Sequence, residues 1–515
     1  MKKIFFVIIC IAFYQHNFAQ EPSDALRYSW YAQNGTARQQ AIGGAMGSLG
    51  GEISSIFVNP AGLGFYRTGD FVLTPGFNFQ NNKGTYFGRT EKAEKNIFSF
   101  GTSGFVVGSP YYQNKRRSSS FSIAINRTAS FGNKILYRGQ QSQNSYSQKF
   151  LEEIDNESVT DPNAVAQNFP FGTSLAFNTF WIDTANGWNS GNHEFVSLSQ
   201  PLLAGGGLLQ ENSITNKGGI TELALGGATN YNDKFLFGAA IAIPFLHYER
   251  EGSFTEADAT TDANNNFDFA VFSENLTTDG VGINLKAGII YKPAEFIRLG
   301  LALHSPTYYV LTDKYNASVT TNTENYQGQL TQSSGLFTNG ADAEFKYVLL
   351  TPYRVIASVS YVLREIEDVR KQKGFLTADI EFVNYKASSF HTHESSNDQA
   401  TKNYLKSLNN AIDNAYKGAI NFRVGGELKF TTIMVRLGGA YYSNPYKNIN
   451  GEKGSKLLLS GGLGYRNKGV FVDLTYVHAI NKDVHFPYRL QSAPFSGASI
   501  KGTNGNVVLT VGFKI

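Results

Sequence analysis

Alternation of apolar and polar residues recurs along most of this chain and predicts β-strands. In residues 281–292, every second residue from Val281 to Tyr291 is apolar, and most of the residues between them are polar or glycine. The same period of two runs through residues 420–430 and through the last residues, 506–515. A strand with one apolar face packs that face against lipid or against a protein core. The pattern therefore predicts an all-β protein.

The connections between the predicted strands alternate in length. Short turns lie at residues 230–233, 292–295, 429–432 and 466–469, and long polar stretches lie at 141–218, 249–278, 315–340, 389–417, 444–455 and 481–502. Outer-membrane barrels join their strands by short periplasmic turns and long outer loops. A soluble β-sandwich has no reason to alternate in this way. We therefore expect a transmembrane antiparallel β-barrel with long outer loops, whose last strand runs to Ile515.

About fourteen strands are expected, an even number that leaves both ends of the wall on the periplasmic side. Residues 118–138 and 344–363 are each counted as one strand, although residues 128–132 and Thr351-Pro352 interrupt them. The predicted strands are 69–80, 96–107, 118–138, 219–230, 234–248, 280–292, 296–312, 344–363, 375–388, 418–430, 433–443, 456–466, 469–480 and 503–515.

The composition fits this class and indicates the compartment. Charged residues make up 17% of the chain, whereas a soluble protein carries about a quarter. No stretch approaches the roughly 20 apolar residues of a membrane-spanning helix. Residues 1–19 join Lys2 and Lys3 to a short apolar run and predict a signal peptide, which contains the only cysteine, Cys10. Without these two lysines, 43 basic residues stand against 41 acidic ones, and nothing indicates nucleic acid as a partner.

The most informative motif is Asn59-Pro60-Ala61-Gly62, which follows a glycine-rich run over residues 43–51 and precedes the first predicted strand. By itself it is an ordinary turn signature. A short irregular N-terminal segment, this turn, and strands to the end of the chain together resemble the FadL family of outer-membrane transporters, in its Bacteroidetes-type branch. The resemblance implies an N-terminal hatch, or plug, at residues 20–66 inside a barrel formed by residues 67–515.

The resemblance also implies a function. FadL-type proteins take up long-chain fatty acids and other hydrophobic compounds by passive diffusion, using hatch movement and a gap beside a kinked third strand. In this chain Ser130, Phe131, Gly132 and Asn133 fall where that gap would lie, and a glycine inside a strand also permits a simple bulge. The expected partners are a hydrophobic ligand, outer-membrane lipid, lipopolysaccharide and the barrel-assembly machinery. No cofactor, no metal and no enzymatic activity are expected.

Three arginines are candidate contacts for an acidic head group. Arg298, Arg423 and Arg436 each lie on the strand face opposite an apolar row. A fatty acid carries one carboxylate, and an arginine can bind a carboxylate through two parallel hydrogen bonds. The alternative for each arginine is an ion pair inside the lumen, with a partner among Glu427, Glu381 and Asp473.

Two further functions stay open. His391 and His393 could place two imidazoles on one face of an extended segment, which suits haem iron and would make the protein a haemin receptor. The alternative, which we favour, is a polar loop just past a strand end. A non-transporting scaffold for secretion or surface assembly could reuse the same fold. Residues 397–416 carry Leu405, Leu408 and Ile412 at helical spacing, which predicts an amphipathic outer-loop helix that covers the barrel mouth or receives ligand.

Overall fold

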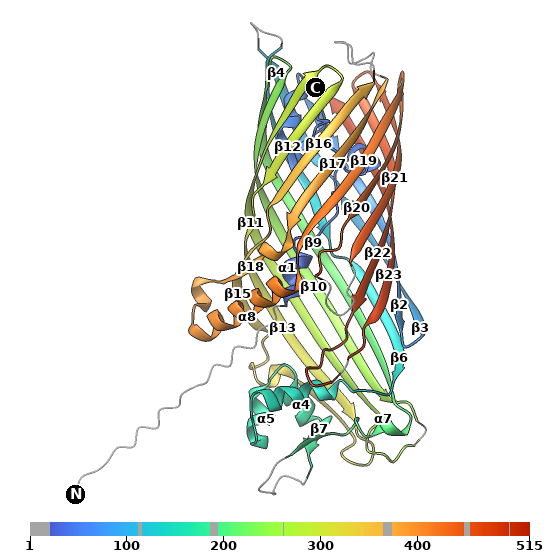
Figure 1. Cartoon of the computed structure of the whole chain (residues 1–515). Coiled ribbons are helices and arrows are strands. Elements are labelled where there is room, and N and C mark those ends of the chain that lie inside the picture. Colours follow the sequence, from blue (N-terminus) through green and yellow to red (C-terminus); the bar gives the residue numbers. More distant parts are fainter. Residues whose placement is uncertain are drawn as a thin grey trace, which may run out of the picture.

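A computed structural model of the protein describes residues 21–111, 116–185, 194–260, 262–363, 373–447, 454–493 and 495–515 (Figure 1). The predicted signal peptide, residues 1–19 with Cys10, lies outside the described residues. Nearly all strands belong to one antiparallel sheet, which closes on itself into a tall barrel. Within the described part of the chain, no helix has the length and apolar character needed to span a bilayer.

The barrel closes through its first strand. β1 (Asp70–Leu73) pairs with β23 (Ala498–Lys514) on one side and with β4 (Ser103–Pro110) on the other. From β4 the pairing passes around the wall and returns to β23, so fourteen strands form a ring without an edge, which confirms the predicted count. In the order of pairing, the other strands are β5 (Ser118–Ser130), β9 (Leu208–Tyr231), β10 (Phe235–Asp258), β11 (Phe269–Ala294), β12 (Ile297–His304), β16 (Arg354–Leu363), β17 (Gly374–Asn384), β19 (Gly418–Phe430), β20 (Ile433–Tyr442), β21 (Ser455–Asn467) and β22 (Val470–His485).

The wall is taller than the sequence predicted. β9 and β10 contain 24 residues each, so the parts of the expected loops at 208–218 and 249–258 are strands. The stretch 81–95, expected as a connection, is a hairpin with a tight turn at Phe87-Gly88. Outside the membrane both faces of a strand are polar, so the alternation is lost while the backbone ladder continues. The strands that complete the wall are β2 (Pro75–Tyr86), β3 (Arg89–Phe100), β6 (Asn133–Gln141), β13 (Tyr308–Asn322), β14 (Gln329–Ser333), β15 (Ala343–Leu350) and β18 (Ser389–Thr392).

The alternating residues sort between lipid and lumen as predicted. On β19, Phe422, Val424 and Leu428 are about half exposed, whereas Arg423 and Glu427 on the opposite face are buried. The outward apolar side chains form a belt around the half of the barrel that carries the C-terminus and the short turns, at the top of Figure 1. A closed barrel with such a belt is an outer-membrane barrel, and its long connections mark the outer side.

The turn between β11 and β12 interrupts the alternation of inward and outward residues. Phe296 continues the inward row of β12 in the sequence pattern, but the residue lies in the turn before β12 and is 44% exposed. Because the ladder between β11 and β12 shifts register at this turn, the alternation does not extend through it. The next members of the row, Arg298 and His304, are buried.

Residues 21–66 lie inside the barrel as a hatch. The glycine-rich run breaks the segment into short pieces, because glycine disfavours helix interiors and permits left-handed turns such as those at Gly43 and Gly44. Most hatch side chains are nonetheless buried, since the wall supplies their surroundings. The elements of the hatch are α1 (Pro22–Arg27), α2 (Ala37–Ala41), α3 (Ser55–Val58) and the 3-10 helix η1 (Pro60–Phe65).

Helices and short strands of the long connections gather at the outer end, below the belt in Figure 1. The predicted amphipathic helix is confirmed as α8 (Gln399–Ala415): Asp398 caps it by accepting from the Thr401 amide at 2.9 Å, and Leu405, Leu408 and Ile412 are buried. The remaining elements are α4 (Ser147–Asn156), α5 (Pro162–Asn168), α6 (Thr173–Asn178), β7 (Ile182–Thr184), β8 (Phe195–Ser197), α7 (Leu202–Gly205), η2 (Ser334–Leu336), η4 (Tyr385–Ala387) and η5 (Glu394–Ser396).

Candidate functional site

The Asn-Pro-Ala turn fastens the hatch to the wall. Asn59 Oδ1 accepts a hydrogen bond from the Ala61 amide at 3.1 Å, which stabilises the start of η1. Asn59 Nδ2 donates to the Gly47 carbonyl at 2.6 Å and to the Ile289 carbonyl of β11 at 3.3 Å. The rest of the motif, residues 60–62, is fully buried. One side-chain amide therefore joins two hatch segments to the barrel.

Wall glycines let the backbone of the hatch approach the strands closely. A side-chain carbon added at Gly238 would clash with Pro60, and one added at Gly300 would clash with Gly47. Such contact leaves no room for a Cβ, which explains why inward positions at this level carry glycine. The same holds for Gly425 and Gly438, which lie against the backbone of Ile42 and Gly43. Gly288 instead leaves room for the Asn59 side chain.

Buried ion pairs complete the seat of the hatch. Arg436 Nε lies 2.6 Å from Glu427 Oε2, and its Nη1 lies 2.5 Å from Asp473 Oδ1. Glu427 also contacts Arg38 of the hatch, at 3.2 Å. A buried charge is tolerated only when it is paired, so this group ties α2 to β19, β20 and β22.

A second charged group lies on the neighbouring strands. Arg423 Nη1 lies 3.1 Å from Glu381 Oε2, and Arg423 Nη2 lies 3.5 Å from Asp379 Oδ2. Asp379 accepts hydrogen bonds from the hatch amides of Met46 and Gly47, at 3.0 and 3.1 Å. The lumen at the level of the hatch therefore contains many charged side chains, and wall carboxylates are neutralised by wall arginines and by hatch groups.

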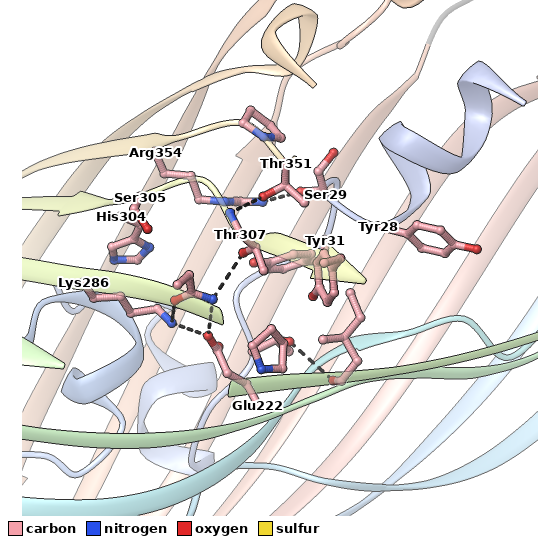
Figure 2. Close-up of a pocket in the computed structure, with 16 residues that line it drawn as sticks. Tyr28, Ser29, Tyr31, Glu222, Lys286, His304, Ser305, Thr307, Thr351 and Arg354 are labelled. Atoms are coloured by element: carbon pink, nitrogen blue, oxygen red, sulfur yellow. Dashed lines mark hydrogen bonds and ion pairs between the residues drawn. The ribbon is translucent and has the colours of Figure 1, made fainter. Parts of the chain in front are cut away.

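A narrow pocket lies beside the hatch, between the N-terminal part of the hatch and the wall (Figure 2). Lys286 and Glu222 form a buried ion pair on one side, and Asn284 contacts both of them. On the other side Arg354 donates to the Ser29 carbonyl and lies over the Tyr31 ring, 4.4 Å from its centroid. The pocket thus presents paired charges next to aromatic rings, a lining that suits an amphiphilic molecule.

Sequence reasoning missed most of these pocket residues. His304 and Arg354 lie beside the breaks between β12 and β13 and between β15 and β16, where Ser305-Pro306 and Thr351-Pro352 interrupt two adjacent strands. Proline cannot donate to a ladder, so strands break there and the flanking side chains turn toward the lumen. An inward polar residue next to a strand proline was the signal that could have identified them.

The third strand of the wall is broken between β5 and β6, at residues 131–132. The partner strand β9 bends opposite the break, where Gly218 has φ +92° and its carbonyl accepts from the Phe131 amide at 3.0 Å. Beyond the break, β6 pairs with β9, and β3 pairs with β2. Among the described residues no ladder joins β3 to β6. The backbone ladder of the wall is therefore interrupted beside Ser130, Phe131, Gly132 and Asn133, where β6 meets the hairpin β2–β3 through other contacts: Asn82 donates to the Lys134 carbonyl at 2.7 Å.

Comparison with solved structures agrees with this architecture. The chain is similar to a FadL homologue from Pseudomonas aeruginosa, with a TM-score of 0.53 and 14% identity over 94% of this chain and 99% of that chain. It is also similar to a deltaS2 mutant of the monoaromatic hydrocarbon channel TodX, with a TM-score of 0.53 and 11% identity over 94% of this chain and 100% of that chain. The chain has the FadL-type fold. No protein-family model and no curated protein matches the sequence.

In this FadL-type barrel, the three candidate arginines all face the lumen and are buried. Arg423 and Arg436 each contact two carboxylates, as described above. Arg298 donates to the Leu49 carbonyl of the hatch at 2.6 Å and lies over the Phe65 ring, 4.5 Å from its centroid. Each arginine thus supports the hatch, and contact with an acidic head group stays a prediction.

Aromatic and aliphatic side chains lie on the outer side of the pocket. Tyr28 at the end of α1 lies 5.7 Å from Phe131 and 6.1 Å from Tyr248, measured between ring centroids. The buried face of α8 belongs to the same cluster, together with Tyr347 and Phe390 of the neighbouring strands. An apolar region therefore extends from the outer helix to the break in the third strand.

The two candidate haem ligands lie at an outer edge of this FadL-type barrel. His391 is on β18 and His393 precedes η5, and their rings contact Ser389 and Ser395 at 2.9 and 2.8 Å. In the parts of the chain that the structure describes, no group of three metal-ligating side chains comes together. Haem binding stays a prediction.

Proposed function

We propose that this protein takes up hydrophobic compounds across the outer membrane by passive diffusion through its plugged barrel, and that long-chain fatty acids are among them. One observation carries the proposal. A single apolar cluster joins α8, the hatch and Phe131, so it links the outer mouth to the discontinuity in the third strand. An apolar solute would leave the outer leaflet, enter this cluster and depart beside residues 130–133.

The pocket of Figure 2 gives the solute's polar end a place on this route. It lies next to the aromatic cluster and includes Thr128 of β5, close to the break. A ligand carboxylate in the pocket would meet cations that already pair with protein carboxylates. Replacing one carboxylate partner by another costs less free energy than leaving a buried arginine or lysine unpaired. The same reasoning keeps Arg298, Arg423 and Arg436 as proposed contacts for an acidic head group during passage.

The similar solved structures support the direction of this proposal without fixing the ligand. One is named as a FadL homologue and the other as a monoaromatic hydrocarbon channel. Only the second name states a cargo, a monoaromatic hydrocarbon. We therefore propose hydrophobic uptake as the activity, with a fatty acid and a monoaromatic compound as the first two substrates to compare.

The test measures entry of a labelled long-chain fatty acid, and separately of toluene, into liposomes that contain the purified barrel and no energy source. Thr128→Phe fills the pocket beside the break and should abolish entry while the barrel stays folded. Thr503→Phe places the same ring on the outward face of β23 and is the matched control. Wild-type entry in Thr128→Phe would exclude this route, and a need for an energy source would exclude passive diffusion.

A further inference from the structure

Four lysines stand side by side on the outer surface of the barrel wall. The antiparallel register places Lys482 of β22 opposite Lys501 of β23, Lys501 opposite Lys83 of β2, and Lys83 opposite Lys92 of β3. Residues directly opposite in a ladder point to the same face. All four side chains are exposed. We call these four residues the lysine row.

The lysine row is unfavourable unless an anion lies against it. Neighbouring strands are only about 4.8 Å apart, and like charges directly opposite destabilise a sheet. None of the four lysines forms an ion pair with another described residue. The outward residues on the far side of the row are uncharged: Val484, Ser499, Thr85 and Thr90. On the near side, Glu94 is the single carboxylate.

The level of the row identifies the kind of anion. The same four strands carry Tyr476, Val507, Phe77 and Phe98 in one outward register row, which belongs to the apolar belt. Phe79 of β2 is the last outward aromatic residue before the row, four residues from Lys83. Four residues of strand span roughly 13 Å, and less along the membrane normal because the strands tilt. The row therefore lies at the head-group level of the outer leaflet, where flexible lysine stems can reach.

The inner face of the same strands is built to hold the row in place. Tyr86 of β2 packs against Tyr137 of β6 with ring centroids 5.2 Å apart, and Ala498 and Ile500 of β23 complete this buried cluster. Tyr137 also contacts His485 of β22 at 2.9 Å. A repulsive row on a sheet that is anchored from behind cannot relax by moving the strands apart. Its charges are neutralised only from outside.

We propose that the lysine row binds the phosphate groups of an outer-leaflet glycolipid. The row spans roughly 15 Å across four strands, which matches a polyanionic head group better than a single small ion. A phosphate next to lysine gains charge-assisted hydrogen bonds, and each basic residue near an anionic membrane surface adds to the attraction. The site rests on the barrel's position in the membrane and not on what the barrel transports.

The test compares binding of phosphorylated lipid A and of dephosphorylated lipid A to the purified full-length barrel in detergent, by native mass spectrometry. Lys83→Gln with Lys501→Gln removes the centre of the row. We expect this pair to weaken binding of the phosphorylated lipid at least tenfold, from roughly fivefold per lysine, and to leave binding of the dephosphorylated lipid unchanged. Lys402→Gln with Lys406→Gln on the exposed face of α8 removes the same charge elsewhere and should change neither.

A second measurement separates a lipid site from a loss of folding. Without phosphorylated lipid the row only repels, so Lys83→Gln with Lys501→Gln should unfold at the same temperature as the wild type or higher. With the lipid, only the wild type and the α8 control should gain thermal stability. Equal lipid binding by wild type and row variant would overturn the proposal. The proposal would also be overturned if the α8 control lost as much binding of the phosphorylated lipid as the row variant, or if the wild type bound both lipids equally.

Discussion

Asn59→Ala should open the hatch without unfolding the barrel. The side chain makes three well-formed hydrogen bonds, to the Ala61 amide and to the Gly47 and Ile289 carbonyls; a fourth contact, to the Leu301 carbonyl at 3.5 Å, is marginal. At about 1 kcal/mol for each bond, the substitution costs the seated hatch about 3 kcal/mol. The population of unseated hatch then rises roughly a hundredfold, because 1.4 kcal/mol corresponds to a factor of ten.

The neighbouring proline provides a graded comparison. Pro60→Ala removes no hydrogen bond and mainly loosens the chain, which costs about 0.4–1 kcal/mol. Its effect on the unseated population should therefore be roughly two- to fivefold. Asn212→Ala removes a buried amide that donates to Tyr137 at 2.7 Å and makes no hydrogen bond to the Asn-Pro-Ala turn, so it serves as the control.

Ion conductance in planar bilayers measures the open fraction, and heat-modifiable mobility on gels confirms that each barrel is folded. Deletion of residues 20–64 sets the fully open limit. We expect conductance to fall in the order of the deletion, Asn59→Ala, Pro60→Ala, and then wild type together with Asn212→Ala. The reasoning fails if Pro60→Ala conducts as much as Asn59→Ala, or if Asn59→Ala stays at the wild-type level while the deletion conducts.

Three further outcomes are expected. Gly425→Leu should displace the hatch and raise conductance, because its side chain would overlap Ile42. Gly439→Leu should not, because a side-chain carbon added there makes only ordinary contacts with Leu458 and Leu459. Fatty-acid binding should weaken in at least one of the variants Arg298→Ala, Arg423→Ala and Arg436→Ala, and wild-type binding by all three would refute head-group contact. Tight haemin binding that is lost on changing His391 and His393 would instead favour haem uptake. Desolvation alone would raise the pKa of Glu152 in α4, but hydrogen bonds from Ser492 and Gln491 lower it below its ordinary value. The contact is thus fully present above about pH 4.3 and lost as the pH falls through the lowered pKa. The protection of these two amide protons against exchange, relative to their intrinsic rates at each pH, should therefore fall on acidification through that pKa and, in Glu152→Gln, be reduced already at pH 7.

The sequence predicted the membrane half of the wall well, because lipid demands an apolar residue at every second position. Residues 420–430 show this clearly, and the apolar set there faces outward. The outer extension of β9 and β10 was missed because water contacts both faces of those strands and removes the pattern. Ion pairs between the lumen arginines and Glu427, Glu381 or Asp473 were predicted as an alternative to head-group contact, and the structure confirms them for Arg423 and Arg436; which carboxylate meets which arginine could not be predicted. The pairing of Arg436 with Glu427 and Asp473 depends on register between distant strands, which periodicity alone does not specify.

The pocket could be predicted only in part. Its proline breaks are visible in the sequence, yet the meeting of Glu222 and Lys286 requires β9 and β11 to flank β10, with both side chains facing inward. The break in the third strand could be located from residues 128–133 alone. Its consequence, the absence of a ladder between β3 and β6 among the described residues, depends on how the hairpin β2–β3 meets β6, which the sequence pattern does not specify.

The glycines of the wall also limit how freely this architecture can be recombined. A hatch normally looks like a detachable module, since it is one continuous segment at the start of the chain. Here its backbone rests on glycines contributed by strands as distant in sequence as Gly238 and Gly438. In a chimera with the hatch of another barrel, the hatch backbone would follow a different path and would no longer pass over these glycines. Hatch and wall must therefore change together during evolution, and exchanging the segment alone should yield barrels that assemble but do not close.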